Sequence, residues 1–218
     1  MRELDVVQAI ARAPMRTMRY ADLRQLGVNV WRTADRLIST GALTRLTKGV
    51  YTAPPDGRDG RTWRPTLETA GLALATARFG NRRAVLMGLG AARFWTAIPR
   101  AIGVTTVAIV EAGRPPVELD RGGTVHLISR DLTKLDTVLE RTELGQGLVT
   151  MPAQTMYDLM MKPNQGRMPE EAHAAVQNLR AQVTSEDLLE VVERLGRANT
   201  RVRELIDQMQ DETRHARD

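Results

Sequence analysis

The side chains with the clearest chemical potential lie in the first quarter of the chain, where hydrogen-bond donors recur at helical spacing. Wound as an α-helix, residues 29–40 separate into an apolar stripe and a polar stripe. The apolar stripe holds Val30, Ala34, Leu37 and Ile38, and the polar stripe holds Asn29, Arg32, Thr33, Arg36 and Thr40. An arginine that binds a guanine edge through two hydrogen bonds discriminates by about 1–3 kcal/mol. The pattern predicts a helix that binds DNA, with Arg32 and Arg36 reading the bases.

A second group of cationic and hydroxyl side chains follows in the segment ALTRLTKGVYTA, residues 42–53. Apolar and polar residues mix there around a Lys-Gly pair, which predicts two strands, 42–47 and 50–53, joined by a tight turn. We expect Leu46 and Val50 to cover the helices, while Arg45, Thr47 and Lys48 project from the tip. Such side chains suit phosphate contacts, which fix position without reading sequence.

The elements that must position these groups are three short helices followed by the hairpin. Helical spacing predicts a first helix over residues 3–13, which Pro14 ends, and a second over residues 20–26 with Gly27 after it. Asn29 is a favourable N-cap for the third helix, and Gly41 closes it. This order is that of a winged helix-turn-helix, in which the third helix enters the major groove. We therefore expect residues 1–55 to form a DNA-binding domain.

The distribution of charge supports the same interpretation. Residues 1–55 contain nine Lys and Arg against four Asp and Glu, so this segment carries the whole net charge of +5. The remaining residues balance. A basic segment on a neutral body is typical of a surface that binds a polyanion.

Beyond residue 55 the sequence predicts a linker and a larger domain. Residues 56–62 are polar and rich in glycine, which is typical of a linker. Residues 63–218 mix predicted helices with strands at 84–87, 105–111, 124–129 and 137–142, and they end in a helical tail. The expected fold is α+β, with a mixed α/β domain after the winged helix. The last helix has an apolar stripe that we expect to pack into the core rather than form a dimer seam.

Composition excludes several kinds of chemistry. The chain has no cysteine, which rules out disulfides, thiolate nucleophiles and cysteine zinc sites, and its three histidines are far apart in sequence. We therefore expect no metal, no cofactor and no enzymatic activity. The longest apolar run, residues 84–92, is too short to span a bilayer, and no export signal is visible at the start. A cytoplasmic location and no membrane partner are expected.

Two patterns in the larger domain could indicate other functions. Gly88-x-Gly90 after a predicted strand is similar to a dinucleotide-binding turn, but Arg93 stands at the third glycine position, which favours a structural turn. Glu68, Glu111 and Asp158 could form a metal-dependent nuclease site, although their spacing gives no compact motif. A third possibility is a regulator whose larger domain senses a small molecule.

Three segments, in this order, resemble one known family. They are GALTRLTKGVYTAP (residues 41–54), the helix that follows VLM in VLMGLGAARFW (residues 85–95), and GLVTMPAQTMYDLM (residues 147–160). The chain resembles the AbiEi antitoxins of bacterial type IV-like toxin–antitoxin and abortive-infection systems, and departs from their common pattern at Gln154. The resemblance implies an antitoxin that binds inverted repeats in its own promoter, represses the operon, and counteracts a nucleotidyltransferase-like toxin. Whether antitoxin and toxin touch stays open.

Overall fold

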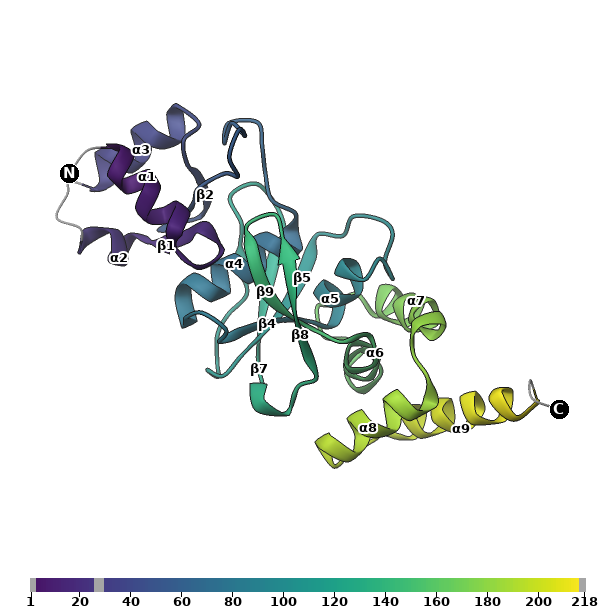
Figure 1. The fold of residues 1–218 in the computed structure, drawn as a ribbon. Helices are drawn as coiled ribbons and strands as arrows, with labels where there is room; N and C mark the ends of the chain where they lie inside the picture. The colour runs from purple at the N-terminus through teal and green to yellow at the C-terminus, as the bar shows by residue number, and fades with distance from the viewer. Residues whose placement is uncertain (1–2, 26–29, 216–218) are drawn as a thin grey trace.

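The described part of the chain forms two β-sheets with helices packed around each of them (Figure 1). The computed structural model describes residues 3–25 and 30–215. Over these residues the fold is α+β, as the sequence predicts, because helices and mixed strands alternate irregularly along the chain. The amino-terminal elements lie at one end of the molecule and the tail helices at the other (Figure 1).

The first sheet belongs to the amino-terminal unit, residues 3–55. The unit consists of α1 (Glu3–Arg12), the 3-10 turn η1 (Pro14–Arg16), β1 (Thr17–Arg19), α2 (Tyr20–Arg24), α3 (Val30–Ser39), β2 (Thr44–Thr47) and β3 (Val50–Thr52). Its strands are antiparallel in the order β1-β3-β2, so the predicted hairpin is present and carries a third strand. The sequence did not predict β1, which pairs Met18 with Tyr51.

A small apolar core holds this unit together. The helices contribute Val6, Ile10, Leu23, Ala34 and Leu37, and the segment around the hairpin contributes Leu43, Tyr51 and Ala53. Each fully buried aliphatic side chain of this kind stabilises the fold by about 1.5–3 kcal/mol. The core therefore fixes the orientation of α3, because Ala34 and Leu37 on its inner face are buried.

The second sheet has six strands in the order β6-β7-β5-β4-β9-β8. They are β4 (Ala84–Met87), β5 (Val104–Ile109), β6 (Val117–Glu118), β7 (Thr124–Ser129), β8 (Thr137–Thr142) and β9 (Gly145–Thr150). The pairs β5/β7 and β4/β9 are parallel, whereas the other neighbours are antiparallel. The sequence predicted four of these strands and missed the short β6 and the glycine-containing β9.

The remaining helices cover this sheet and form the tail. They are α4 (Leu67–Phe79), α5 (Gly88–Phe94), α6 (Pro152–Met161), α7 (Pro169–Leu179), α8 (Ser185–Leu195) and α9 (Thr200–His215), with 3-10 turns η2 (Leu132–Lys134) and η3 (Arg180–Gln182). Helix α8 begins at the capping box of Thr184 and Asp187 and ends at Gly196, whose positive φ suits glycine. Helix α5 ends at Phe94, and Thr96 after it has a positive φ.

The apolar stripe of α9 packs inward, as predicted. Val202, Leu205, Ile206 and Met209 are buried and belong to one cluster with residues of α6, α7 and α8. The tail thus shares a core with α5 and α6 beside the sheet.

The amino-terminal unit is joined to the larger domain by a shared core and by hydrogen bonds. Met15, Leu46 and Val50 belong to the cluster that also contains residues of α4 and the six-stranded sheet. The predicted linker, residues 56–62, is fastened as well, because Gly60 N donates to Gly41 O at 2.8 Å and Arg16 forms an ion pair with Asp56. The hairpin and α4 therefore hold the two predicted domains in contact.

Candidate nucleic-acid interface

Helix α3 presents a polar face to solvent, as its periodicity predicts. Arg32 and Arg36 are exposed, while Ala34 and Leu37 are buried on the opposite side. Thr33 is half-buried. The predicted N-cap Asn29 and the predicted inward side chain of Val30 lie outside the described residues. The helix therefore offers two arginines on one accessible face.

Arg36 of α3 pairs with an acid at the start of α1. Arg36 Nε lies 3.0 Å from Glu3 Oε1, yet its side chain stays 71% exposed. An ion pair this accessible is screened by water and contributes at most about 1 kcal/mol. The guanidinium of Arg36 can therefore exchange Glu3 for a stronger anion at little cost.

An aromatic pair that sequence reasoning missed stands beside the α3 arginines. Trp31 is 50% exposed, and its ring meets that of Tyr20 edge to face, with centroids 6.2 Å apart. A single exposed apolar side chain is common on protein surfaces, so Trp31 adds contact area here but does not by itself mark a partner site. The signal in the sequence was a tryptophan directly before Arg32 in the first turn of the helix.

Of the three hairpin residues that were predicted to contact DNA, only Lys48 lies free at the tip. Lys48 is exposed in the turn between β2 and β3. Gly49 follows with φ 76°, a conformation that favours glycine, and its carbonyl accepts a hydrogen bond from Tyr20 N at 2.8 Å. The turn is therefore fixed against α2, with Lys48 pointing into solvent.

The expectation that Thr47 projects from the hairpin tip is wrong. Thr47 is 7% exposed, and its Oγ1 donates a 2.9 Å hydrogen bond to the carbonyl oxygen of Glu118 in β6. Its side chain is turned toward the larger domain because β2 packs there. The hydroxyl of Thr47 is therefore turned away from the solvent-exposed tip.

Arg45 also departs from the expected projection, because it is held by the larger domain. Its Nε forms an ion pair with Oδ2 of Asp120, which lies two residues after the end of β6. The backbone N of Asp120 also donates a hydrogen bond to Leu46 O at 2.9 Å. The hydrogen bond to Asp120 raises the pKa of Arg45, and Asp35 on α3 adds to this more weakly. Arg45 thus lies between α3 and the larger domain and keeps less than half of its side chain exposed.

Two arginines of the larger domain lie in the same cavity lining as Arg45. Arg64 and Arg121 line, together with Arg45, a cavity of about 220 Å³ between the hairpin and the larger domain. Arg121 donates hydrogen bonds to the carbonyl oxygens of Arg61 and Gly60, at 3.2 and 3.3 Å. Counting charge by segment missed these residues, because acids elsewhere in the larger domain balance them.

The acids considered for a nuclease site are not brought together. Glu68, Glu111 and Asp158 each face a different arginine, namely Arg93 at 3.6 Å, Arg83 at 3.5 Å and Arg130 at 3.8 Å. Within residues 3–25 and 30–215, no group of three or more His, Cys, Asp or Glu is placed to hold a metal ion.

The Gly88-x-Gly90 turn has a packing explanation. A Cβ on Gly90 would lie 2.7 Å from a methyl of Leu86 and 3.0 Å from the carbonyl oxygen of Thr106. Glycine is needed there because α5 approaches β4 and β5 closely. Thr106 Oγ1 also lies 3.4 Å from Gly90 N, so this amide faces the protein itself.

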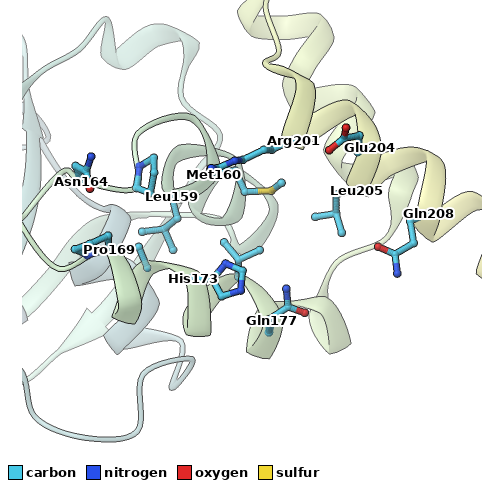
Figure 2. A pocket seen from close by; sticks show the side chains of 13 residues that line it. Leu159, Met160, Asn164, Pro169, His173, Gln177, Arg201, Glu204, Leu205 and Gln208 are labelled. Carbon is cyan, nitrogen blue, oxygen red and sulfur yellow. The ribbon is translucent and has the colours of Figure 1, made fainter.

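A cavity of about 560 Å³ lies between α6, α7 and α9. Figure 2 shows Leu159 and His173 on one side and Leu205 and Gln208 of α9 on the other. Its apolar floor is continuous with the tail core, and its rim mixes acidic, basic and amide groups. The cavity is far from α3, because α9 lies at the opposite end of the molecule (Figure 1).

Fold and surface together define an α+β chain with an exposed basic helix in its amino-terminal unit. No protein-family model matches the chain, and no curated protein does. The chain is similar in fold to the crystal structure of RV2827C protein from Mycobacterium tuberculosis, with a TM-score of 0.56 and 19% identity. The match covers 86% of this chain and 70% of that chain. In the described part of the chain, no helix has the length and apolar character needed to cross a membrane.

Proposed function

We propose that the chain is a DNA-binding antitoxin that represses its own operon. The observation that carries the DNA-binding half is the exposed face of α3, where Arg32 and Arg36 stand clear of a buried inner face. The antitoxin half rests on the resemblance of residues 41–54, 85–95 and 147–160 to AbiEi antitoxins. The two halves are separable by experiment.

The order of elements supports a winged helix-turn-helix for residues 1–55. Helix, strand, two helices and a hairpin follow one another, and the strand after α1 joins the hairpin in one sheet. In such a unit the helix before the hairpin enters the major groove. The proposed reading helix is therefore α3, with Arg32 and Arg36 directed at base edges.

Phosphate contacts would flank this helix on the hairpin side. Lys48 is exposed at the turn, and Arg45, Arg64 and Arg121 lie where the hairpin meets the larger domain. Cations at such positions fix the register of a protein on the duplex without reading sequence. One module of this size buries only about 600–1,000 Å² on DNA, so tight binding calls for two copies on inverted repeats.

The test of the DNA-binding half uses the region upstream of the gene. Fluorescence anisotropy with that duplex and with a shuffled duplex of equal length measures specific binding, and a promoter reporter measures repression. We expect preference for the natural duplex and repression that rises with antitoxin expression. Equal binding of both duplexes would remove the autorepressor proposal.

The test of the antitoxin half is growth rescue by co-expression. An adjacent nucleotidyltransferase-like gene is expressed alone and together with this chain. We expect growth arrest in the first case and rescue in the second, including with Arg32→Ala/Arg36→Ala if the larger domain provides antitoxicity. Absence of rescue by the wild-type chain would refute this half and leave a DNA-binding regulator.

A further inference from the structure

A second cationic site lies in the larger domain, at the far end of the molecule from α3 (Figure 1). It is a cavity of about 350 Å³ between the segment after β7, the carboxyl-terminal half of α6 and the connection between α8 and α9. Its cationic lining residues are Arg130, Lys134, Lys162 and Arg197. Four positive side chains from three segments line this cavity because the tail packs against α6.

The acids in the cavity lining are engaged by the protein itself. Asp131 caps η2, where it accepts hydrogen bonds from Thr133 N at 3.1 Å and Thr133 Oγ1 at 2.6 Å. Asp158 is 3% exposed and lies 3.8 Å from Nη2 of Arg130. Two acids therefore oppose four cations, which leaves the lining with a surplus of positive charge.

Three of these cations act on the buried carboxylate of Asp158. Burial raises the pKa of Asp158 to about 6, while Arg130, Arg197 and Lys162 all favour its charged form. One carboxylate cannot neutralise three cations, so the lining keeps a surplus of positive charge that favours an anionic ligand. Arg130 is itself mostly buried, so its guanidinium is held in a fixed place beside Asp158.

The cavity lining also contains apolar and aromatic side chains. Leu135, Tyr157, Met161 and Leu195 contribute there. The hydroxyl of Tyr157 donates to the carbonyl oxygen of Arg197 at 2.8 Å, which fixes the loop that carries this arginine. A cavity lined by both cations and apolar side chains matches a ligand that joins an anionic group to a flat apolar one.

We infer that this cavity binds a phosphorylated small molecule of nucleotide size. The lining supplies guanidinium and ammonium donors for a phosphate group, and the apolar residues supply a surface for a base. The volume lies within the range of about 300–1,000 Å³ typical of small-molecule sites. The site is independent of the DNA interface, since α3 lies at the opposite end of the molecule (Figure 1).

Isothermal titration of the full chain without DNA tests this inference. The probes are the four common nucleoside monophosphates, pyrophosphate and uncharged adenosine, each at the same ionic strength. We expect at least one nucleoside monophosphate to bind more tightly than adenosine by about tenfold or more, as a charge-assisted phosphate contact requires. Binding of pyrophosphate but of no nucleoside monophosphate would support the phosphate site and show that the cations alone determine its specificity. Absence of binding by every phosphate probe, or equal binding of adenosine, would overturn the inference.

The variant that tests the assignment is Lys162→Gln/Arg197→Gln, because both side chains are exposed and removable without opening the core. Arg214→Gln on α9 is the matched control, an exposed arginine outside the cavity lining. We expect the double variant to lose phosphate affinity about tenfold or more and the control to retain it. Equal affinity in both proteins would refute the site. Loss of promoter affinity in the double variant would also overturn it, since these cations would then serve DNA.

Discussion

The two parts of the proposed DNA surface, helix α3 and the β2–β3 hairpin, use similar side chains in different ways. On α3, Arg32 and Arg36 stay exposed, and the ion pair of Arg36 with Glu3 is highly accessible to solvent. On the hairpin, Arg45 is bound to Asp120 and Thr47 is bonded to Glu118, so only Lys48 keeps the expected free position. Residue type shows which contacts a side chain can make, whereas packing decides which contact it makes.

This difference assigns two roles to residues that look alike in the sequence. The outer face of α3 is available to a partner, because its apolar side already satisfies the core. The hairpin joins that core to the larger domain through Leu46 and Val50. We therefore expect changes in the hairpin to alter stability first and changes on α3 to alter binding first.

The largest effect on stability is expected at Leu46, a buried residue of the shared core. Leu46→Ala should lower the free energy of unfolding by about 2–5 kcal/mol, because it removes apolar contacts and leaves a cavity. Urea unfolding measures this, with the exposed Leu4→Ala as a control that should change little. Two separate transitions, with the larger domain unaffected by the substitution, would contradict a core shared between unit and domain.

A smaller effect on stability, which depends on pH, is expected at Asp158. Its side chain is buried, whereas that of Asp120, the other arginine-paired aspartate, is partly exposed. Burial raises the pKa of Asp158 from 3.8 to about 6, so the folded chain holds this proton more tightly than the unfolded chain does. Its contribution to stability is therefore complete below about pH 4 and is lost as the pH rises through about 6. A shift of about two pKa units corresponds to about 3 kcal/mol.

Asp158→Asn removes this titration and is the way to measure it. The difference in unfolding free energy between wild type and variant should move by up to about 3 kcal/mol in favour of the variant between about pH 4 and pH 7. Urea unfolding across this range provides the measurement, and Asp120→Asn serves as the partly exposed comparison. A difference that does not vary with pH would show that Asp158 titrates as it would in water.

The hydroxyl of Thr47 should contribute about 1 kcal/mol to stability and little to DNA binding, because it donates to the carbonyl oxygen of Glu118 in the larger domain. Thr47→Val keeps the shape of the side chain and removes the donor. Thermal unfolding and promoter binding are both measured, with Thr213→Val as the control, an exposed threonine of the tail whose hydroxyl donates within its own helix. A weakened complex with unchanged stability would return Thr47 to the interface.

The smallest effect is expected at Asp120, which holds Arg45. Asp120→Asn should tighten promoter binding by about two- to fivefold, because a weak, partly exposed pair worth up to about 1 kcal/mol is released. Lys48→Ala should act in the opposite direction and reduce the salt dependence of binding by about one phosphate contact. Weaker DNA binding by Asp120→Asn would indicate that the ion pair positions Arg45 rather than competing with DNA.

Local patterns predicted much of this structure because local interactions determine those elements. The two faces of α3 follow from helical periodicity, and the ends of α8 follow from Thr184, Asp187 and Gly196. Strand β1 could not be read in the same way, since its three residues are ordered by pairing with a strand more than thirty positions away. Strand β9 contains Gly145 and Gly147, which disfavour a strand unless neighbours on both sides hold it.

The residues of the candidate site, too, were predictable from the sequence only where local structure determines their exposure. Arg32 and Arg36 were found because their own helix exposes them. The pairing of Arg45 with Asp120 spans 75 positions and follows no local pattern, and the exposure of Trp31 depends on how α2 and α3 pack. Long-range contacts of this kind decide which predicted contact residues remain free.

The most direct test of the account is promoter binding by Arg32→Ala/Arg36→Ala, measured by fluorescence anisotropy at fixed salt. Both side chains are exposed, so the fold should be kept, and Arg214→Ala provides a matched arginine on the tail. We expect the double variant to bind at least about thirtyfold more weakly than wild type, since each base-reading arginine contributes about 1 kcal/mol or more. The tail variant should bind as wild type does. Unchanged binding by a folded Arg32→Ala/Arg36→Ala protein would contradict the claim that α3 reads DNA.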